Sequence, residues 1–188
     1  MRNYKLYIDD NPLAIDLESA LAKMTEQRRT KVLAFKHEQG RKLSAAAYIL
    51  LCKAIKEEYG IDEPPVFEYS EHGKPSIVGH PEIYFNLSHC RSVAACVVSL
   101  SPVGVDVEDV REFKESLARY VLNDDEYAAV MSSQSPAQEF IRLWTMKESY
   151  LKLTGEGITR DLKTVLTDIG KYHFDTRFLH TSILTICY

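Results

Sequence analysis

Two acidic residues, Asp106 and Glu108, stand one residue apart in VGVDVEDV, a valine-rich stretch that predicts a buried strand. Side chains at positions i and i+2 of a strand leave from the same face, so both carboxylates are expected to point the same way. Two like charges at this spacing repel each other, and each resists losing its water. The stretch therefore predicts a positively charged group between the two acids.

A second group of charged residues lies in a predicted helix that follows Ser135 and ends at Gly155. Its start has Ser135 as the N-cap, Pro136 in the first turn and Gln138 to close a capping box. Its apolar stripe consists of Phe140, Leu143, Trp144, Tyr150 and Leu151. Lys147 falls inside this stripe, and because a buried ammonium group without a partner is costly, we interpret it as facing an anion at the sheet edge. Glu148 and Lys152 lie one turn apart on the flank.

Asp106, Glu108 and Glu148 together offer the hard oxygen ligands that Mg²⁺ prefers, and Mn²⁺ accepts the same ligands. Taken singly, the strand acids also fit a solvated strand end, and Glu148 with Lys152 fits a surface pair worth ~0.5 kcal/mol or less. A cation held by all three carboxylates would leave coordination positions for phosphate oxygens. The combination predicts a metal site that handles a phosphate-containing substrate.

Other polar residues fit the same chemistry. Ser88 and His89 end the predicted strand in FNLSHC, where a hydroxyl and an imidazole can both reach a phosphate. Lys74 follows Gly73 and is held by Pro75. His89 also fits an ordinary loop or core histidine, and Lys74 also fits an exposed turn lysine. The basic residues of the first half form a solvated helix face from which one or two can meet phosphate; they are Arg28, Arg29, Lys31, Lys36, Arg41 and Lys42.

Composition excludes several classes of protein. The chain has 188 residues, 45% of them hydrophobic, and a net charge of -4, so no global basic field favours nucleic acid or an anionic membrane surface. The four cysteines form no C-x-x-C pair, which favours reduced thiols and a cytoplasmic location. No apolar run approaches the ~20 residues that span a bilayer, and the first residues do not resemble a signal peptide.

The order of predicted elements indicates an α+β fold. Strands are expected at 4–8, 66–70, 74–78, 83–88, 92–100, 103–110, 161–169 and 182–188, and helices at 16–36, 41–58, 113–131 and 136–154. The turn at Ser101-Pro102 predicts that the strands at 92–100 and 103–110 pair with each other. This order divides the chain into two similar α+β halves, 1–101 and 102–188.

Four motifs, GKP, FNLSHC, GVDVE and WTMKESYLKLTGEG, occur in this order between about residues 25 and 160. Together they resemble the phosphopantetheinyl transferase superfamily, and the chain length resembles its surfactin-synthetase-activating type. That type is a pseudo-dimer of two α+β halves, each a small, mostly antiparallel sheet packed with a long helix. The resemblance implies Mg²⁺-dependent transfer of 4'-phosphopantetheine from coenzyme A to a serine of an apo acyl or peptidyl carrier protein, with release of adenosine 3',5'-bisphosphate.

The resemblance also implies roles for individual residues. Asp106, Glu108 and Glu148 match the Mg²⁺ ligands, and Lys152 matches the lysine on the pyrophosphate. Residues that match or adjoin the coenzyme A contacts are Lys74, Pro75, Ser88, His89 and Lys147, with His89 at the 3'-phosphate. Arg41 corresponds to a basic residue of the first half that grips the adenosine phosphate, with Lys31 and Lys42 as rivals.

The proton acceptor and the docking surface for the carrier protein are two hypotheses. Glu148 is expected to accept the proton of the carrier serine, directly or through water, with Glu126 as the rival base. A carrier protein is expected to dock on the segment after Glu108, at Arg111, Phe113, Leu117, Arg119 and Tyr120, although these apolar residues also fit the inner face of a helix.

Two other functions remain as alternatives. Strand and helix acids with a lysine also occur in metal-dependent phosphodiesterases, but the acid-x-lysine order common there is absent around Glu148. A non-catalytic coenzyme A binding module is the second alternative, and the intact set of acids with Lys152 argues against it. With both halves in one chain, a monomer is expected.

Overall fold

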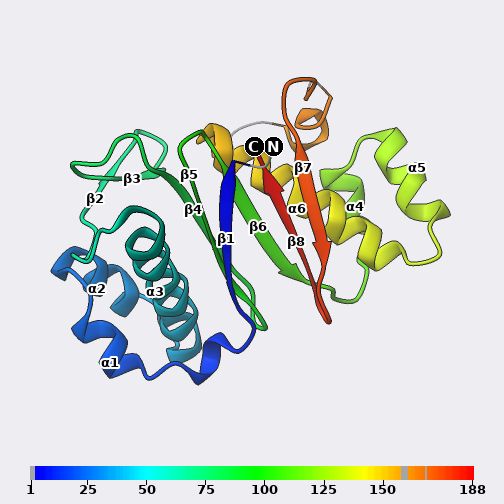
Figure 1. Ribbon diagram of the computed structural model, residues 1–188. Helices are drawn as coiled ribbons and strands as arrows, with labels where there is room; N and C mark the ends of the chain where they lie inside the picture. The colour runs from blue at the N-terminus through cyan, green and yellow to red at the C-terminus, as the bar shows by residue number, and fades with distance from the viewer. Residues whose placement is uncertain (1–2, 158–160, 168) are drawn as a thin grey trace.

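The computed structural model describes residues 3–157, 161–167 and 169–188 of the chain. Two three-stranded antiparallel sheets lie edge to edge, each covered by one long helix (Figure 1). The first sheet has the order β1 (Tyr4–Asp9), β5 (Ala94–Ser99), β4 (Tyr84–His89), and the second β6 (Gly104–Asp109), β8 (Ser182–Cys187), β7 (Phe174–Phe178). A separate hairpin joins β2 (Phe67–Tyr69) and β3 (Pro75–Ile77). The predicted α+β class is confirmed.

Two long helices dominate the helical layer, α3 (Glu38–Tyr59) on the first sheet and α6 (Pro136–Thr154) on the second. Both end at a glycine in the left-handed region, Gly60 with φ 73° and Gly155 with φ 75°, as the sequence predicts. The Ser135 side chain accepts no capping hydrogen bond from the described residues, so the expected capping box at α6 is wrong. No helix in the described part of the chain combines the length and apolar composition needed to cross a bilayer.

The shorter helices correct two of the predicted boundaries. The segment 16–36 forms α1 (Leu17–Ala22) and α2 (Glu26–Leu33), and 113–131 forms α4 (Glu115–Val121) and α5 (Asp124–Ser132). Each break lies at a side-chain cap: Thr25 Oγ1 accepts from the Arg28 amide, and Asn123 closes a capping box with Glu126. These caps satisfy the first amides of a new helix, and therefore favour two helices over one.

Two strand predictions are also wrong. The strand at 92–100 does not pair with the one at 103–110, because β5 has β1 and β4 on its two edges and β6 pairs with β8. The described residues of 161–169 form a 3-10 turn, η2 (Leu162–Thr164), instead of a strand. Leu162 and Val165, three residues apart, both enter the core from this turn.

Side chains, in place of a backbone ladder, join the two sheets where β4 lies beside β6. Asn86 Oδ1 accepts a hydrogen bond of 3.0 Å from the Val105 amide, and Ser88 Oγ accepts one of 3.2 Å from the Val107 amide. β1 and the C-terminal residue add to this junction, since the rings of Tyr4 and Tyr188 lie 5.0 Å apart. The two sheets therefore meet in one shared core, and a domain boundary at residues 101/102 stays a prediction.

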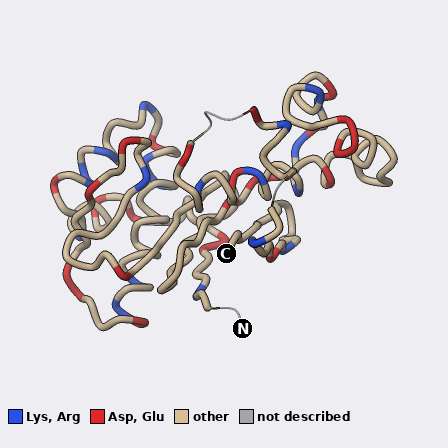
Figure 2. The backbone as a smooth tube through the Cα atoms, turned by 90° about the horizontal axis from the view of Figure 1, so that it is seen from above, with Lys and Arg blue, Asp and Glu red and all other residues tan. Residues whose placement is uncertain are grey.

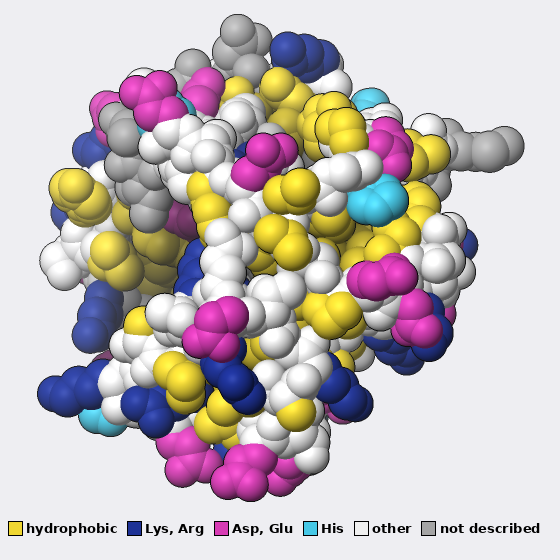
Figure 3. All heavy atoms as spheres, turned by 90° about the vertical axis from the view of Figure 1, so that its left-hand side faces the viewer, with side chains coloured by type: hydrophobic (Ala, Val, Ile, Leu, Met, Phe, Trp, Pro, Cys, Tyr) yellow, Lys and Arg dark blue, Asp and Glu magenta, His cyan; other side chains and the backbone are white. Residues whose placement is uncertain are grey.

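Charged residues are spread over both halves of the molecule. Figure 2 shows Lys and Arg interspersed with Asp and Glu along the whole backbone tube. Figure 3, which looks onto the side of the first half, likewise shows basic side chains standing among acidic and hydrophobic ones. Any strong binding of an anion must therefore depend on local contacts, as the net charge of -4 indicates.

Helix α6 packs directly on β6 because residue 104 is glycine. A Cβ added to Gly104 would overlap the carbonyl oxygen of Ser149 and lie 2.6 Å from the amide nitrogen of Leu153. Both atoms belong to the backbone of α6, which cannot move aside without shifting the helix. Gly104 thus sets the distance between the strand that carries Asp106 and the helix that carries Glu148.

The Gly104→Ala variant is expected to lose about 3 kcal/mol of unfolding free energy, because the added methyl must push α6 off the sheet. Urea unfolding followed by circular dichroism measures the loss. Gly170→Ala is the matched control, since a Cβ there meets no atom within 4 Å. Equal stability of the two variants would contradict the close approach of strand and helix.

Candidate functional site

Asp106 lies at the centre of a polar cluster built by three elements. Its side chain comes from β6 and the residue is 4% exposed, and its Oδ1 accepts from Ser88 Oγ of β4 at 2.9 Å and from Lys152 Nζ of α6 at 2.6 Å. Lys152 also donates to Ser88 Oγ at 3.0 Å. Lys152 is therefore the positive group beside Asp106, whereas the cation expected between Asp106 and Glu108 stays a prediction, and the cluster bridges both halves of the molecule.

Two carboxylate oxygens in this cluster are buried without a hydrogen-bond partner among the described residues. They are Oδ2 of Asp106 and Oε1 of Glu148. Burial raises the pKa of Glu148, the negative charge of Asp106 raises it further, and Lys152 opposes the shift. Buried unpartnered oxygens are costly, and a hard divalent cation is the ligand that would satisfy both.

Glu108 follows on the same strand and is the most perturbed acid of the site. Burial raises its pKa to about 7, with a further contribution from Asp106, while Arg111 and Lys152 oppose the shift. An Arg111 guanidinium nitrogen lies 3.8 Å from Glu108 Oε2.

Within residues 3–157, 161–167 and 169–188, no group of three His, Cys, Asp or Glu side chains is gathered closely enough to hold a metal ion. The three-carboxylate site therefore stays a prediction.

Two cavities adjoin the cluster. One of about 190 Å³ is lined by Lys74, Pro75, Asn86, Glu148, Lys152 and Gly155, among others. A larger one of about 690 Å³ is lined by Gln39, Leu43, His89, Cys90, Arg91, Glu108, Asp109 and Arg111. Glu148 faces the first cavity and Glu108 the second. Basic residues line both cavities, Lys74 and Lys152 the first and His89 and Arg111 the second.

The predicted phosphate contacts Lys74 and His89 each line one of these cavities. Lys74 donates to the carbonyl of Leu153 at the end of α6, and burial lowers the pKa of its ammonium group. Burial likewise lowers the pKa of His89, and the positive charges of Lys152 and Arg28 lower it further. An anionic group in either cavity would therefore be stabilised by the basic residue that lines it.

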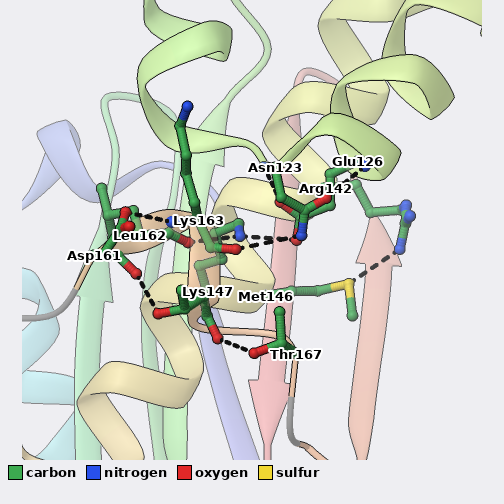
Figure 4. Close-up of polar contacts among 10 residues, drawn as sticks. Asn123, Glu126, Arg142, Met146, Lys147, Asp161, Leu162, Lys163 and Thr167 are labelled. Atoms are coloured by element: carbon green, nitrogen blue, oxygen red, sulfur yellow. Dashed lines mark hydrogen bonds and ion pairs between the residues drawn. The ribbon is translucent and has the colours of Figure 1, made fainter.

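Lys147 has a different partner from the one predicted. It is 1% exposed, and its Nζ lies 2.8 Å from Glu126 Oε1 of α5 and 2.8 Å from the Leu162 carbonyl oxygen (Figure 4). The interpretation of Lys147 as facing an anion at the sheet edge is wrong, because its anion is Glu126 on the far side of α6. Glu126, the rival base, uses its other oxygen to accept from the Asn123 amide.

The basic residues proposed for the first half make local contacts. Arg41 Nε donates to the Phe35 carbonyl at 2.8 Å, Lys42 Nζ lies 3.5 Å from Glu38, and Lys31 Nζ lies 4.7 Å from the centre of the Tyr69 ring.

Arg28 belongs to the basic group that the sequence offers for phosphate binding, but it was not singled out for the adenosine phosphate as Arg41, Lys31 and Lys42 were. It is 7% exposed, donates to Ser44 at the carbonyl (2.7 Å) and hydroxyl (2.8 Å), and its Nε has no partner among the described residues. Its charge also reaches His89. The available signal was its position three residues after the cap Thr25 and four before the buried Val32, which turns it inward.

The predicted docking segment borders an apolar groove of about 250 Å³. Its lining includes Arg111, Lys114, Leu117, Phe140, Ile141 and Trp144. Leu117 and Tyr120 are 41% and 73% exposed, whereas Phe113 packs against Phe140 with ring centres 6.0 Å apart. Arg119 is paired with Glu115 at 2.8 Å. The sequence placed Phe140 and Trp144 in the helix core without predicting that they also form a groove floor.

The stability of the chain without divalent cations is expected to fall as the pH rises from about 5 to 7. The pKa of Glu108 in the folded state, about 7, lies above its ordinary value, so the folded state binds this proton more tightly than the unfolded state. Glu108→Gln should remove this part of the pH dependence and be more stable than the wild type at pH 8 but not at pH 4. Urea unfolding at a series of pH values measures the free energy of unfolding, and Glu71→Gln, at an exposed turn, is the control. If this free energy depends on pH in the same way in the wild type and in Glu108→Gln, the raised pKa is contradicted.

Comparison with known proteins places this site in a family context. The sequence model of the 4'-phosphopantetheinyl transferase superfamily matches residues 102–184. A 4'-phosphopantetheinyl transferase of Bacillus subtilis is 28% identical over 165 residues, which cover 86% of this chain and 74% of that protein. The transferase psf-1 of Bacillus pumilus is 29% identical over 160 residues, covering 84% and 69%. The transferase gsp of Aneurinibacillus migulanus is 35% identical over 99 residues, covering 52% and 41%.

Proposed function

This chain belongs to the 4'-phosphopantetheinyl transferase superfamily, and we propose that it transfers 4'-phosphopantetheine from coenzyme A to a serine of an apo acyl or peptidyl carrier protein. Adenosine 3',5'-bisphosphate is the leaving product. The observation that carries the proposal is the buried cluster of Ser88, Asp106 and Lys152, flanked by the unpartnered oxygens of Asp106 and Glu148.

Coenzyme A suits the charges around this cluster. Its diphosphate and 3'-phosphate are strongly anionic, and Lys74, Lys152 and His89 line the two cavities, while the charge of the buried Arg28 acts on His89. Phosphoryl transfer depends chiefly on positioning and on fixed positive charge near the oxygens that gain charge. We assign Lys152 to the diphosphate and Arg28 with His89 to the 3'-phosphate, in place of Arg41, Lys31 or Lys42.

Mg²⁺ suits the chemistry of the oxygen donors, which in the described structure are not gathered into one site. Asp106, Glu108 and Glu148 would hold it, and Mn²⁺ could replace it, because their oxygens are hard ligands and two of them have no partner in the described structure. Lys152 engages only Oδ1 of Asp106, which leaves Oδ2 for a cation. When bound, such a metal supplies positive charge to the phosphate oxygens of the substrate.

Glu148 is the base that we assign to the carrier serine. Its raised pKa makes the carboxylate a stronger proton acceptor, and with Oε1 toward the cation its Oε2 would take the proton. Glu126 is unsuitable because Lys147 and the Asn123 amide occupy its two oxygens. The proton of the serine hydroxyl would pass to Glu148 as the oxygen attacks the β-phosphorus.

The carrier protein would dock over α4 and the apolar groove beside it. Arg111 and Lys114 stand at the edge of a floor made by Phe140, Ile141 and Trp144, and this combination suits an acidic helix with an apolar face. The groove also contains Glu108, so a docked serine would lie beside the acids.

The Arg111→Glu variant tests this surface and is expected to raise the KM for carrier protein. A KM equal to that of the wild type would reject the surface.

We further infer that the protein works in the cytoplasm as a monomer, with coenzyme A and a carrier protein as its partners and without nucleic acid or membrane. The support is that Cys52, Cys90, Cys96 and Cys187 are all free, as in a reducing compartment, and that both halves of the site lie in one chain. A phosphodiesterase or a non-catalytic coenzyme A binding module is the less favoured function, because the relatives are named transferases.

Incubation with coenzyme A, Mg²⁺ and an apo carrier protein is expected to add one phosphopantetheine group to the carrier. Intact-protein mass spectrometry detects the adduct, and chelation of the metal with EDTA should abolish it. Hydrolysis of coenzyme A without a carrier adduct would favour the phosphodiesterase, and binding without any reaction would favour the binding module.

Glu148→Gln is expected to lower kcat about 10²-fold or more at saturating Mg²⁺, because the amide cannot accept the serine proton. The Kd for coenzyme A, measured by calorimetry, should stay near the wild-type value. Glu139→Gln, on the first turn of the same helix, is the control and should keep full turnover. Undiminished kcat in Glu148→Gln would rule out this residue as the base.

A further inference from the structure

We infer that Lys147 is a positioning residue: through Glu126 and Leu162 it fixes helix α4 relative to the face of α6 that carries Glu148. This inference rests on the proposed function, since α4 forms the surface on which the carrier protein would dock. It assigns Lys147 and Glu126 to carrier recognition instead of coenzyme A binding or proton transfer.

The first argument is the cost and the pairing of the buried charge. Lys147 is 1% exposed, and the Glu126 side chain is 12% exposed. Two of the three ammonium N–H groups are used, one by Glu126 Oε1 and one by the Leu162 carbonyl, both at 2.8 Å (Figure 4). Apolar residues of similar volume would often give equal stability at such a place, so a buried pair of this kind suits a role in fixing geometry.

The second argument is the set of segments that the pair ties together. Glu126 Oε2 accepts from the Asn123 amide at 3.0 Å, and Asn123 Nδ2 donates to the Lys163 carbonyl at 3.3 Å. Asn123 lies in the turn between α4 and α5, and Lys163 lies in η2. Lys147 therefore connects α6 to this turn, to the first turn of α5 and to η2 at the same time.

The third argument is the packing of η2 against α4. Leu162, whose carbonyl Lys147 holds, is 7% exposed and belongs to the same apolar cluster as Ala118 and Val121 of α4. The exposed side chains of α4, Leu117 and Tyr120, lie on its outer surface. A shift of η2 would thus move the base on which the proposed docking helix rests.

The opposite side of α6 is held independently of this pair. Gly104 allows direct contact between β6 and the backbone of α6, and Thr145 Oγ1 lies 2.8 Å from Thr185 Oγ1 of β8. Loss of the Lys147 contacts should therefore loosen α4, α5 and η2 while Glu148 and Lys152 keep their places. The two kinds of substrate binding then respond differently, which separates a positioning role from general destabilisation.

Lys147→Met is expected to raise the KM for carrier protein about tenfold, the size of effect known for residues that act through a packed network. The Kd for coenzyme A of the same variant should differ less than about twofold from that of the wild type. Steady-state kinetics with carrier protein varied at saturating coenzyme A, and calorimetry with coenzyme A, provide the two values. Lys171→Met, an exposed lysine of the same half, is the matched control.

Glu126→Gln breaks the same ion pair from the other side and keeps the side-chain volume. It should show the same pattern with a smaller rise in KM, and it decides the question if Lys147→Met does not fold.

A rise in KM for carrier with unchanged coenzyme A affinity supports the inference. Unchanged KM, or weaker coenzyme A binding with unchanged KM, overturns it. An inactive wild-type chain overturns the proposed function and this inference together, whereas an active wild type with unaltered variants overturns the inference alone.

Discussion

The contact between Asp106 and Lys152 is the interaction on which the rest of the site depends. A carboxylate only 4% exposed needs a positive partner, and the ammonium group 2.6 Å away comes from a helix that begins thirty residues later in the chain. Ser88 brings the first half of the molecule into the same cluster. The edge-to-edge packing of the two sheets therefore also assembles the site.

This arrangement explains why small features of the backbone matter for the chemistry. The amides of Val105 and Val107 find their acceptors in Asn86 and Ser88, so β4 and β6 keep a fixed alignment without a ladder between them. Gly104 lets α6 approach the strand closely enough for Lys152 to reach Asp106. One oxygen of Asp106 is thereby held by the protein, and the other is left for a ligand.

Much of the site could be predicted from the sequence because its signals are local. The spacing of Asp106 and Glu108 on a strand, and of Glu148 and Lys152 on a helix, singled out these residues, and the structure brings Asp106 and Lys152 into contact. Both long helices end at the predicted glycines. Arg28 and Lys147 were harder, because the partners that define them lie 16 and 21 residues away. Periodicity shows that Lys147 is buried but cannot show that its anion is Glu126. The pairing of β6 with β8 depends on residues about eighty positions apart, so the adjacent β5 was the wrong choice.

A crystal structure with coenzyme A and Mn²⁺, whose anomalous scattering identifies the ion, tests the central claim most directly. The account predicts one metal ion bound to Asp106, Glu108 and Glu148, at about 2.0–2.3 Å from each ligating oxygen, with Lys152 on the diphosphate. Coenzyme A bound with its diphosphate distant from Asp106, or a metal ion ligated by other residues, would contradict it.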